Sequence, residues 1–139
     1  MSDDLNTPST TRSPGEIIQT KTGIVYLRAD GILKVELVPN SVIELEEAHE
    51  LIRAQKILAA GKKRPLLVDL RNINSINRPA RLYLGETEAA ENVNATALYI
   101  NSPVAKIIGN FMIGLNKTLY PTSLFVSEEK AFEWLKTFL

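Results

Sequence analysis

The chain has 139 residues, 45% of them hydrophobic and 23% charged, which predicts one globular domain with a sizeable core. Sixteen basic residues balance sixteen acidic ones, so net charge provides no general attraction to nucleic acid or to an anionic membrane. The absence of cysteine excludes disulfides, thiolate catalysis and cysteine-bound metals.

Residues 1–20 are rich in Ser, Thr, Asp, Asn and Pro and offer few apolar side chains for packing. Such a segment cannot offset its ordering entropy, which predicts a flexible polar tail before a single domain over residues 21–139. The polar start lacks the apolar core of a signal peptide, and no run approaches the roughly 20 apolar residues of a membrane span. We therefore expect a cytoplasmic protein.

The domain is predicted to open with a β-hairpin. Apolar-rich runs at 24–28 and 32–37 flank an Asp-Gly pair at 30–31, which suits a tight turn with positive φ. In the second run, apolar residues alternate with Lys34 and Glu36. This alternation predicts a strand near the sheet edge with one partly solvated face.

Helices are predicted over about 44–60, 79–91 and 103–116, and a fourth follows a Ser127 cap. The second is expected to turn a narrow stripe of residues inward and to point two large side chains away from it. The stripe comprises Leu82, Gly85, Ala89 and Val93, and the outward side chains are Tyr83 and Leu84. The third is expected to bury one broad apolar face formed by Val104, Ile107, Ile108, Phe111, Met112 and Leu115.

Short buried strands are predicted near residues 65–70, 95–100 and 123–126. The element order is therefore β-β-α-β-α-β-α-β-α, and strands joined through helices should be parallel. The predicted fold class is α/β, with a mixed sheet of about five strands.

The stretch LVDLRNINSIN at 67–77 resembles the central strand and loop of the STAS domain, the fold of sulfate-transporter cytoplasmic modules and anti-sigma-factor antagonists. The element order over about 22–139 agrees with that family. The chain is also similar to the small bacterial STAS-like relatives of Sec14 lipid-transfer domains. The resemblance implies a STAS-like fold and, in the antagonists, a site where the loop meets the next helix.

The motif departs from the antagonists where they carry Asp-Ser-Ser-Gly, because this chain has Asn77-Arg78-Pro79-Ala80. Proline occupies the position of the phosphate-accepting serine, so the family's phosphorylation switch is not implied here, and Ser75 does not replace that serine by position. A loop-to-helix platform remains, which Arg71, Arg78 and Arg81 would make attractive to anions if they converge.

Residue types that carry chemistry are sparse. His49 is the only histidine and lacks spaced metal-ligating partners, so a solvated or ion-paired role is favoured. Asp69 follows a strand and is either a general base or, more commonly for such acids, an acceptor for loop N–H groups. No phosphate loop, nucleophile elbow or basic–aromatic stripe is present. We expect no enzyme activity, no cofactor, no metal and no nucleic-acid partner.

Two functions remain open from the sequence. The first is a bacterial signalling or regulatory module that binds another protein or, as a homo-oligomer, a second copy of itself. Its candidate contact residues are Arg71, Asn77, Arg78, Arg81, Tyr83 and Leu84. The alternative is a binder of a lipid or small apolar molecule, with Ile108, Gly109 and Met112 on the pocket wall.

Overall fold

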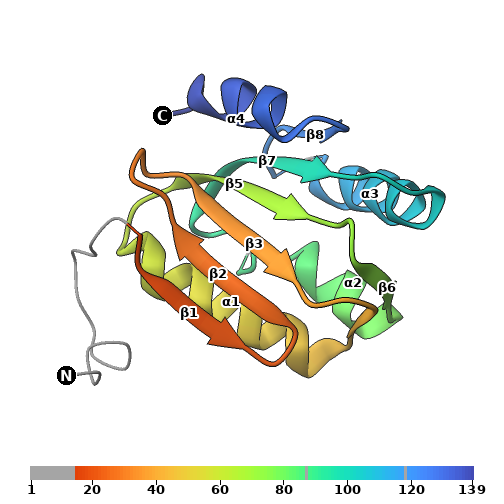
Figure 1. Ribbon diagram of the computed structural model, residues 1–139. Coiled ribbons are helices and arrows are strands. Elements are labelled where there is room, and N and C mark those ends of the chain that lie inside the picture. Colours follow the sequence, from red (N-terminus) through yellow and green to blue (C-terminus); the bar gives the residue numbers. More distant parts are fainter. Residues whose placement is uncertain (1–14, 87, 118) are drawn as a thin grey trace.

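The computed structural model describes residues 15–86, 88–117 and 119–139, which form an α/β fold (Figure 1). The strands are β1 (Ile17–Thr20), β2 (Gly23–Leu27), β3 (Leu33–Leu37), β4 (Ser41–Ile43), β5 (Arg64–Asp69), β6 (Ile73–Ile76), β7 (Val93–Tyr99) and β8 (Thr122–Phe125). The helices are α1 (Leu45–Ala59), α2 (Arg78–Leu84), α3 (Pro103–Asn116) and α4 (Glu128–Lys136). The predicted fold class is confirmed.

The main sheet has six strands in the order β1-β2-β3-β5-β7-β8, where about five were predicted. The first three pair antiparallel, and β3, β5, β7 and β8 pair parallel. The additional strand, β1, lies within the segment predicted as a flexible tail. It is ordered because its backbone pairs along β2, where Ile18 lies opposite Val25. Short strands β4 and β6 form a separate parallel pair that was also not predicted.

The hairpin between β2 and β3 is confirmed, with positive φ at Gly31, but β3 is not near the edge. It lies between β2 and β5, and Lys34 is buried rather than solvated. Its ammonium group pairs with Glu36 and with Glu128 of α4. The polar alternation in β3 therefore reflects an ion-pair network on one face of the sheet.

Helices cover the sheet unequally (Figure 1). One core cluster joins α1, α2 and α3 to one face, through residues such as Leu51, Tyr83 and Ala105. On the other face, α4 buries Ala131 and Leu135 against residues of β5 and β7. None of the helices in the described ranges is long and apolar enough to cross a bilayer.

The helix boundaries are confirmed where capping residues mark them. The hydroxyl oxygens of Ser102 and Ser127 accept backbone N–H bonds at the starts of α3 and α4. In contrast, α2 is shorter than predicted and ends at Leu84, because the N–H groups of Gly85 and Glu86 bond to carbonyls three residues earlier and close a turn.

The predicted inward stripe of α2 is wrong as a helix face, because its buried members Ala89 and Val93 lie beyond the end of the helix. Ala80 and Tyr83 are the buried residues of this helix, whereas Leu82 is 52% exposed. The Tyr83 ring packs edge-on against the His49 ring of α1, with 4.3 Å between the ring centres. Contact with α1 therefore decides which face of α2 turns inward.

Candidate functional site

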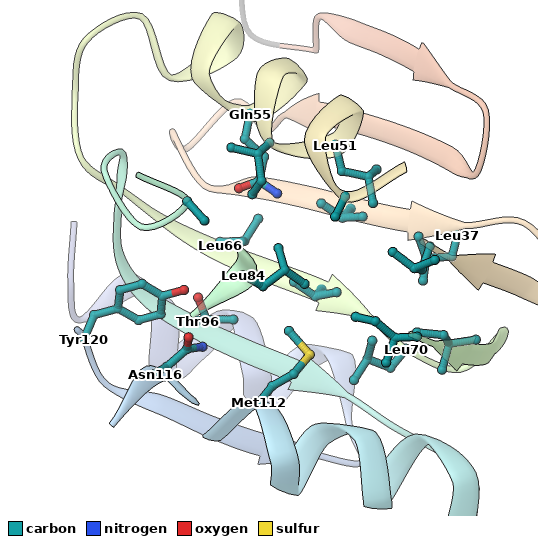
Figure 2. Close-up of a pocket in the computed structure, with 18 residues that line it drawn as sticks. Leu37, Leu51, Gln55, Leu66, Leu70, Leu84, Thr96, Met112, Asn116 and Tyr120 are labelled. Atoms are coloured by element: carbon teal, nitrogen blue, oxygen red, sulfur yellow. The ribbon is translucent and has the colours of Figure 1, made fainter. Parts of the chain in front are cut away.

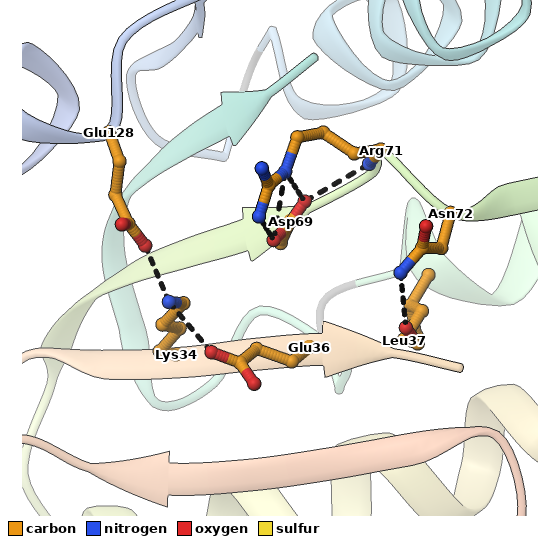
Figure 3. Close-up of polar contacts among 7 residues, drawn as sticks. All are labelled: Lys34, Glu36, Leu37, Asp69, Arg71, Asn72 and Glu128. Atoms are coloured by element: carbon orange, nitrogen blue, oxygen red, sulfur yellow. Dashed lines mark hydrogen bonds and ion pairs between the residues drawn. The ribbon is translucent and has the colours of Figure 1, made fainter. Parts of the chain in front are cut away.

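Asp69 and Arg71 form a closed pair at the carboxyl end of β5 (Figure 3). The Asp69 carboxylate accepts the Arg71 backbone N–H at 3.0 Å and the guanidinium Nη2 at 2.9 Å. The guanidinium also lies 4.3 Å from the centre of the Tyr99 ring. These bonds to Asp69 raise the pKa of Arg71 above its ordinary range, although partial burial opposes the rise. Asp69 thus organises the following loop, and Arg71 already has an anionic partner.

A second charge cluster lies beside this pair, because Glu36 on β3 is in register with Asp69 on β5. Lys34 Nζ lies 2.7 Å from a Glu36 oxygen and also contacts Glu128 of α4 (Figure 3). Burial by itself would lower the pKa of Lys34, but hydrogen bonds to the two carboxylates raise it above its usual range. The cluster ties α4 to the sheet.

Two polar side chains of the loop-to-helix platform form hydrogen bonds with the protein's own backbone. The Asn77 side chain accepts the Ala80 N–H at 3.0 Å and caps α2, and the Asn72 amide donates to the Leu37 carbonyl at 3.1 Å. The three arginines that would attract anions if they converged have different surroundings. Arg71 turns to Asp69, Arg81 stacks on Phe111 of α3 at 4.8 Å, and Arg78 is exposed.

The outer side of α2 and α3 forms a second candidate site. We call it the α2–α3 surface, and it consists of Arg78, Arg81, Leu82, Val104, Lys106, Ile107 and Phe111. Ile107 is 70% exposed, and its neighbours at 104 and 111 are exposed on the same side of α3. The broad face predicted to be buried is therefore only partly covered.

Small residues explain this orientation of α3. Ala105 and Gly109 are buried against the sheet, and a Cβ added at Gly109 would lie 2.6 Å from Leu124 Cδ2. Close approach along this line turns the larger Val104, Ile107 and Phe111 outward. Helical periodicity identifies apolar positions but does not reveal which of them another element covers.

The α2–α3 surface is cationic as well as apolar. Neither α2 nor α3 contains an acidic residue. Within the described part of the chain, Arg78, Arg81 and Lys106 form no ion pair, and the buried Nε of Arg81 has no hydrogen-bond partner. The surface thus offers unpaired positive charge beside exposed apolar side chains.

A partly open cavity of about 70 Å³ lies between the sheet and helices α1, α2 and α3 (Figure 2). Of the predicted pocket residues, Met112 lines it, whereas Ile108 and Gly109 are not part of its wall. Leu84 also lines the cavity, and Tyr83 is buried, so these two candidate partner residues face inward.

Four polar side chains on the cavity wall were not predicted as site residues. They are Gln55, Thr96, Asn116 and Tyr120. Gln55 had a detectable signal, because it falls on the otherwise apolar inner face of α1. Thr96 lies within a strand of mainly apolar residues, and Asn116 lies at the end of a helix. Neither position suggested a binding residue in the sequence.

The candidate His49 and two acidic residues that follow α2 have structural partners. Lys56 of α1 pairs with Glu91 at 3.1 Å and with Glu88 at 3.9 Å, and both glutamates face solvent. His49 packs on Tyr83. No group of three or more His, Asp or Glu side chains suited to a metal ion occurs among the residues that the structure describes.

Comparisons with known proteins identify a matching family and a solved structure with a similar fold. Residues 25–139 match the family described as Domain of unknown function (DUF7793). A solved structure of an uncharacterised DUF3478-family protein from Shewanella loihica PV-4, described as having a SpoIIAA-like fold, is similar over 90% of this chain and 97% of its own. The sequence identity is 15% and the TM-score is 0.54.

A protein of unknown function from Arthrobacter sp. FB24 is 26% identical, covering 86% of this chain and 97% of its own, with a TM-score of 0.33. No curated protein matches the sequence. The Shewanella structure confirms the predicted STAS-like fold, because SpoIIAA-like and STAS denote the same architecture.

Proposed function

This chain belongs to the DUF7793 family and has a STAS-like fold, and we propose that it is a non-enzymatic module that binds another protein through its α2–α3 surface. The exposed apolar row on α3, flanked by unpaired cations, is the observation that carries the proposal. A regulatory role in bacterial signalling follows from the STAS resemblance and forms part of the same proposal.

The apolar row has the character of an interface centre. Val104, Ile107 and Phe111 follow helical spacing and are all exposed, whereas an outer helix face is normally polar. Burying such side chains contributes roughly 25 cal/mol per Å² of apolar surface removed from water. Large apolar side chains enclosed by a charged rim are typical of protein interfaces.

The cations specify the chemistry of the partner. Arg78, Arg81 and Lys106 lack acidic neighbours on α2 and α3, so an acidic partner would supply the missing charge. Complementary charge mainly sets orientation and association rate, while the apolar contacts retain the partner. We therefore expect an acidic, amphipathic segment or surface on the partner.

The lipid-binding alternative has weaker support. The cavity has a volume of about 70 Å³, whereas sites for drug-sized ligands commonly enclose roughly 300–1,000 Å³, so a lipid chain would not fit it. A lipid chain would need α3 to move away from the sheet. The exposed surface requires no such rearrangement.

Site-specific photo-crosslinking in the native host tests the proposal. A benzophenone amino acid replaces Ile107, and the same substitution at Ile17 is the control, because Ile17 is 51% exposed on β1 at the opposite edge of the sheet. We expect one protein to crosslink from position 107 and not from position 17.

Binding of the purified partner is then measured by calorimetry. Ile107→Asp and the pair Arg78→Glu/Lys106→Glu should each weaken binding at least 10-fold without lowering the melting temperature. The pair Lys62→Glu/Lys63→Glu, exposed beyond α1, is the charge-matched control. Equal binding by all variants, crosslinking only to a second copy, or binding only to anionic vesicles would overturn the proposal.

A further inference from the structure

The cavity beneath α3 contains buried polar groups without partners. Thr96 is 1% exposed, and its Oγ1 atom has no hydrogen-bond partner among the described residues. Asn116 and Gln55 are 3% and 6% exposed, and within the described ranges their side-chain amides form no hydrogen bond, although unlike Thr96 Oγ1 the amide atoms are not themselves fully buried. Buried polar groups in native proteins are nearly always paired, so the unpaired Thr96 hydroxyl beside two unbonded amides on one cavity wall indicates a missing occupant.

These groups give the cavity two chemically different regions. Figure 2 shows Thr96 of β7, Asn116 of α3 and Tyr120 gathered at one end, with Gln55 entering from α1. The remainder of the wall is mainly aliphatic, including Leu66, Leu84 and Met112. The occupant must therefore combine an apolar body with a hydrogen-bonding group.

The wall excludes a charged occupant. None of the residues that line the cavity carries an ionised side chain at neutral pH. Burial raises the pKa of Tyr120, and the nearby Thr96 hydroxyl opposes this only in part, without reaching hydrogen-bond geometry. An ion placed there would lose its hydration without gaining a counter-charge.

The volume limits the size of the occupant. About 70 Å³ exceeds the roughly 10–15 Å³ that one water requires and is about half of the roughly 150 Å³ engineered apolar cavity that binds benzene. Met112 on the wall is unbranched and flexible, so it can adjust to a bound molecule.

From these contacts we propose that the cavity is a binding site for a small uncharged molecule with an apolar body and one hydroxyl or amide group, which Thr96, Asn116 and Gln55 bind. The site is separate from the α2–α3 surface and does not depend on the proposed partner binding.

Ethanol, chloroethane and acetate test this assignment, because each is small enough for a cavity of this size and they differ in the polar group. Titrations follow the Met112 methyl signal by NMR. We expect ethanol to saturate the site, chloroethane to bind at least 10-fold more weakly and acetate not to bind. A co-crystal structure should show the ethanol hydroxyl within hydrogen-bond distance of Thr96 or Asn116.

Two threonine variants separate recognition from stability. Thr96→Val removes the hydroxyl that faces the cavity, and Thr22→Val removes another buried, unpaired hydroxyl that does not line it. Thr96→Val should reduce the preference for ethanol over chloroethane at least 5-fold, whereas Thr22→Val should leave it unchanged.

The wild-type titration decides the question even if a variant does not fold. Equal affinity for ethanol and chloroethane, failure of ethanol to saturate the site below concentrations that unfold the protein, or a co-crystal with only ordered water in the cavity would each overturn the assignment.

Discussion

The ammonium group of Lys34 on β3 forms an ion pair with Glu128 in the first turn of α4, joining residues 94 positions apart in the chain. Lys34 is buried, while the Glu128 side chain retains partial exposure. The remaining contacts of α4 with the sheet are largely apolar. This pair therefore fixes the start of the helix on its face of the sheet.

Removing Glu128 should weaken the docking of α4. We expect Glu128→Ala to lower the free energy of unfolding by about 1–2 kcal/mol, between the values typical of exposed and of buried ion pairs. Urea denaturation measures the loss, and Glu129→Ala, an exposed neighbour, should cost less than about 0.5 kcal/mol. In a Lys34→Met background the cost of Glu128→Ala should largely disappear, and an unchanged cost would refute the coupling.

Glu47 should make the stability of the protein fall as the pH becomes acidic. Its carboxylate lies 3.0 Å from Lys21 Nζ and accepts the Glu44 backbone N–H, and chiefly the Lys21 bond lowers its pKa in the folded state. This stabilisation is present above the unfolded pKa of about 4.3 and is lost as the pH falls through the lower folded value. The melting temperature of Glu47→Gln should therefore lie below that of the wild type at neutral pH, with the two converging in acid. Glu46→Gln, at an exposed neighbour, is the control, and a gap that persists in acid would contradict this origin.

The two glycines of α3 should respond differently to alanine. At Gly114 an added Cβ meets no atom within 4 Å, so Gly114→Ala should stabilise the protein by roughly 0.5–1 kcal/mol. At Gly109 the added Cβ approaches Leu124, so this gain is offset by overpacking of roughly 1–3 kcal/mol. Thermal unfolding should rank Gly114→Ala above wild type and Gly109→Ala at or below it. The reverse order would show that α3 does not pack closely on β8.

Asp69 should act as a structural acceptor. Asp69→Asn removes the charge that binds the Arg71 guanidinium and backbone N–H, and it should cost about 1–3 kcal/mol of unfolding free energy. Arg71→Lys should cost less unfolding free energy than Asp69→Asn, because lysine keeps the positive charge. Some cost remains, because lysine cannot form the two-pronged contact. Denaturant titration of both variants measures the difference. An Asp69→Asn variant with an unchanged free energy of unfolding would contradict this role.

The sequence was most informative where a residue type has a local mechanism. The Ser127 cap predicted the start of α4 correctly, and the Asp-Gly pair predicted the hairpin. The very short strands β4 and β6 could not be predicted, because their pairing is non-local and their sequences do not alternate. The length of α2 depended on an early turn at Gly85 that helix periodicity does not encode.

Functional candidates were harder to predict because exposure depends on neighbours. Arg71 was selected for its charge, yet Asp69 two residues earlier already binds it. Ile107 was expected in the core, although the close contact at Gly109 turns it outward. Thr96 became a candidate only when the structure showed that its buried hydroxyl lacks a partner.

The order of strands in the main sheet has a consequence for synthesis of the chain. Strands β1, β2, β3, β5, β7 and β8 are neighbours in the same order in which a ribosome produces them. Each new strand can therefore add to a free edge, and none must insert between two strands already paired. Folding can follow translation by accretion, with α4 docking last because it is the final helix to emerge.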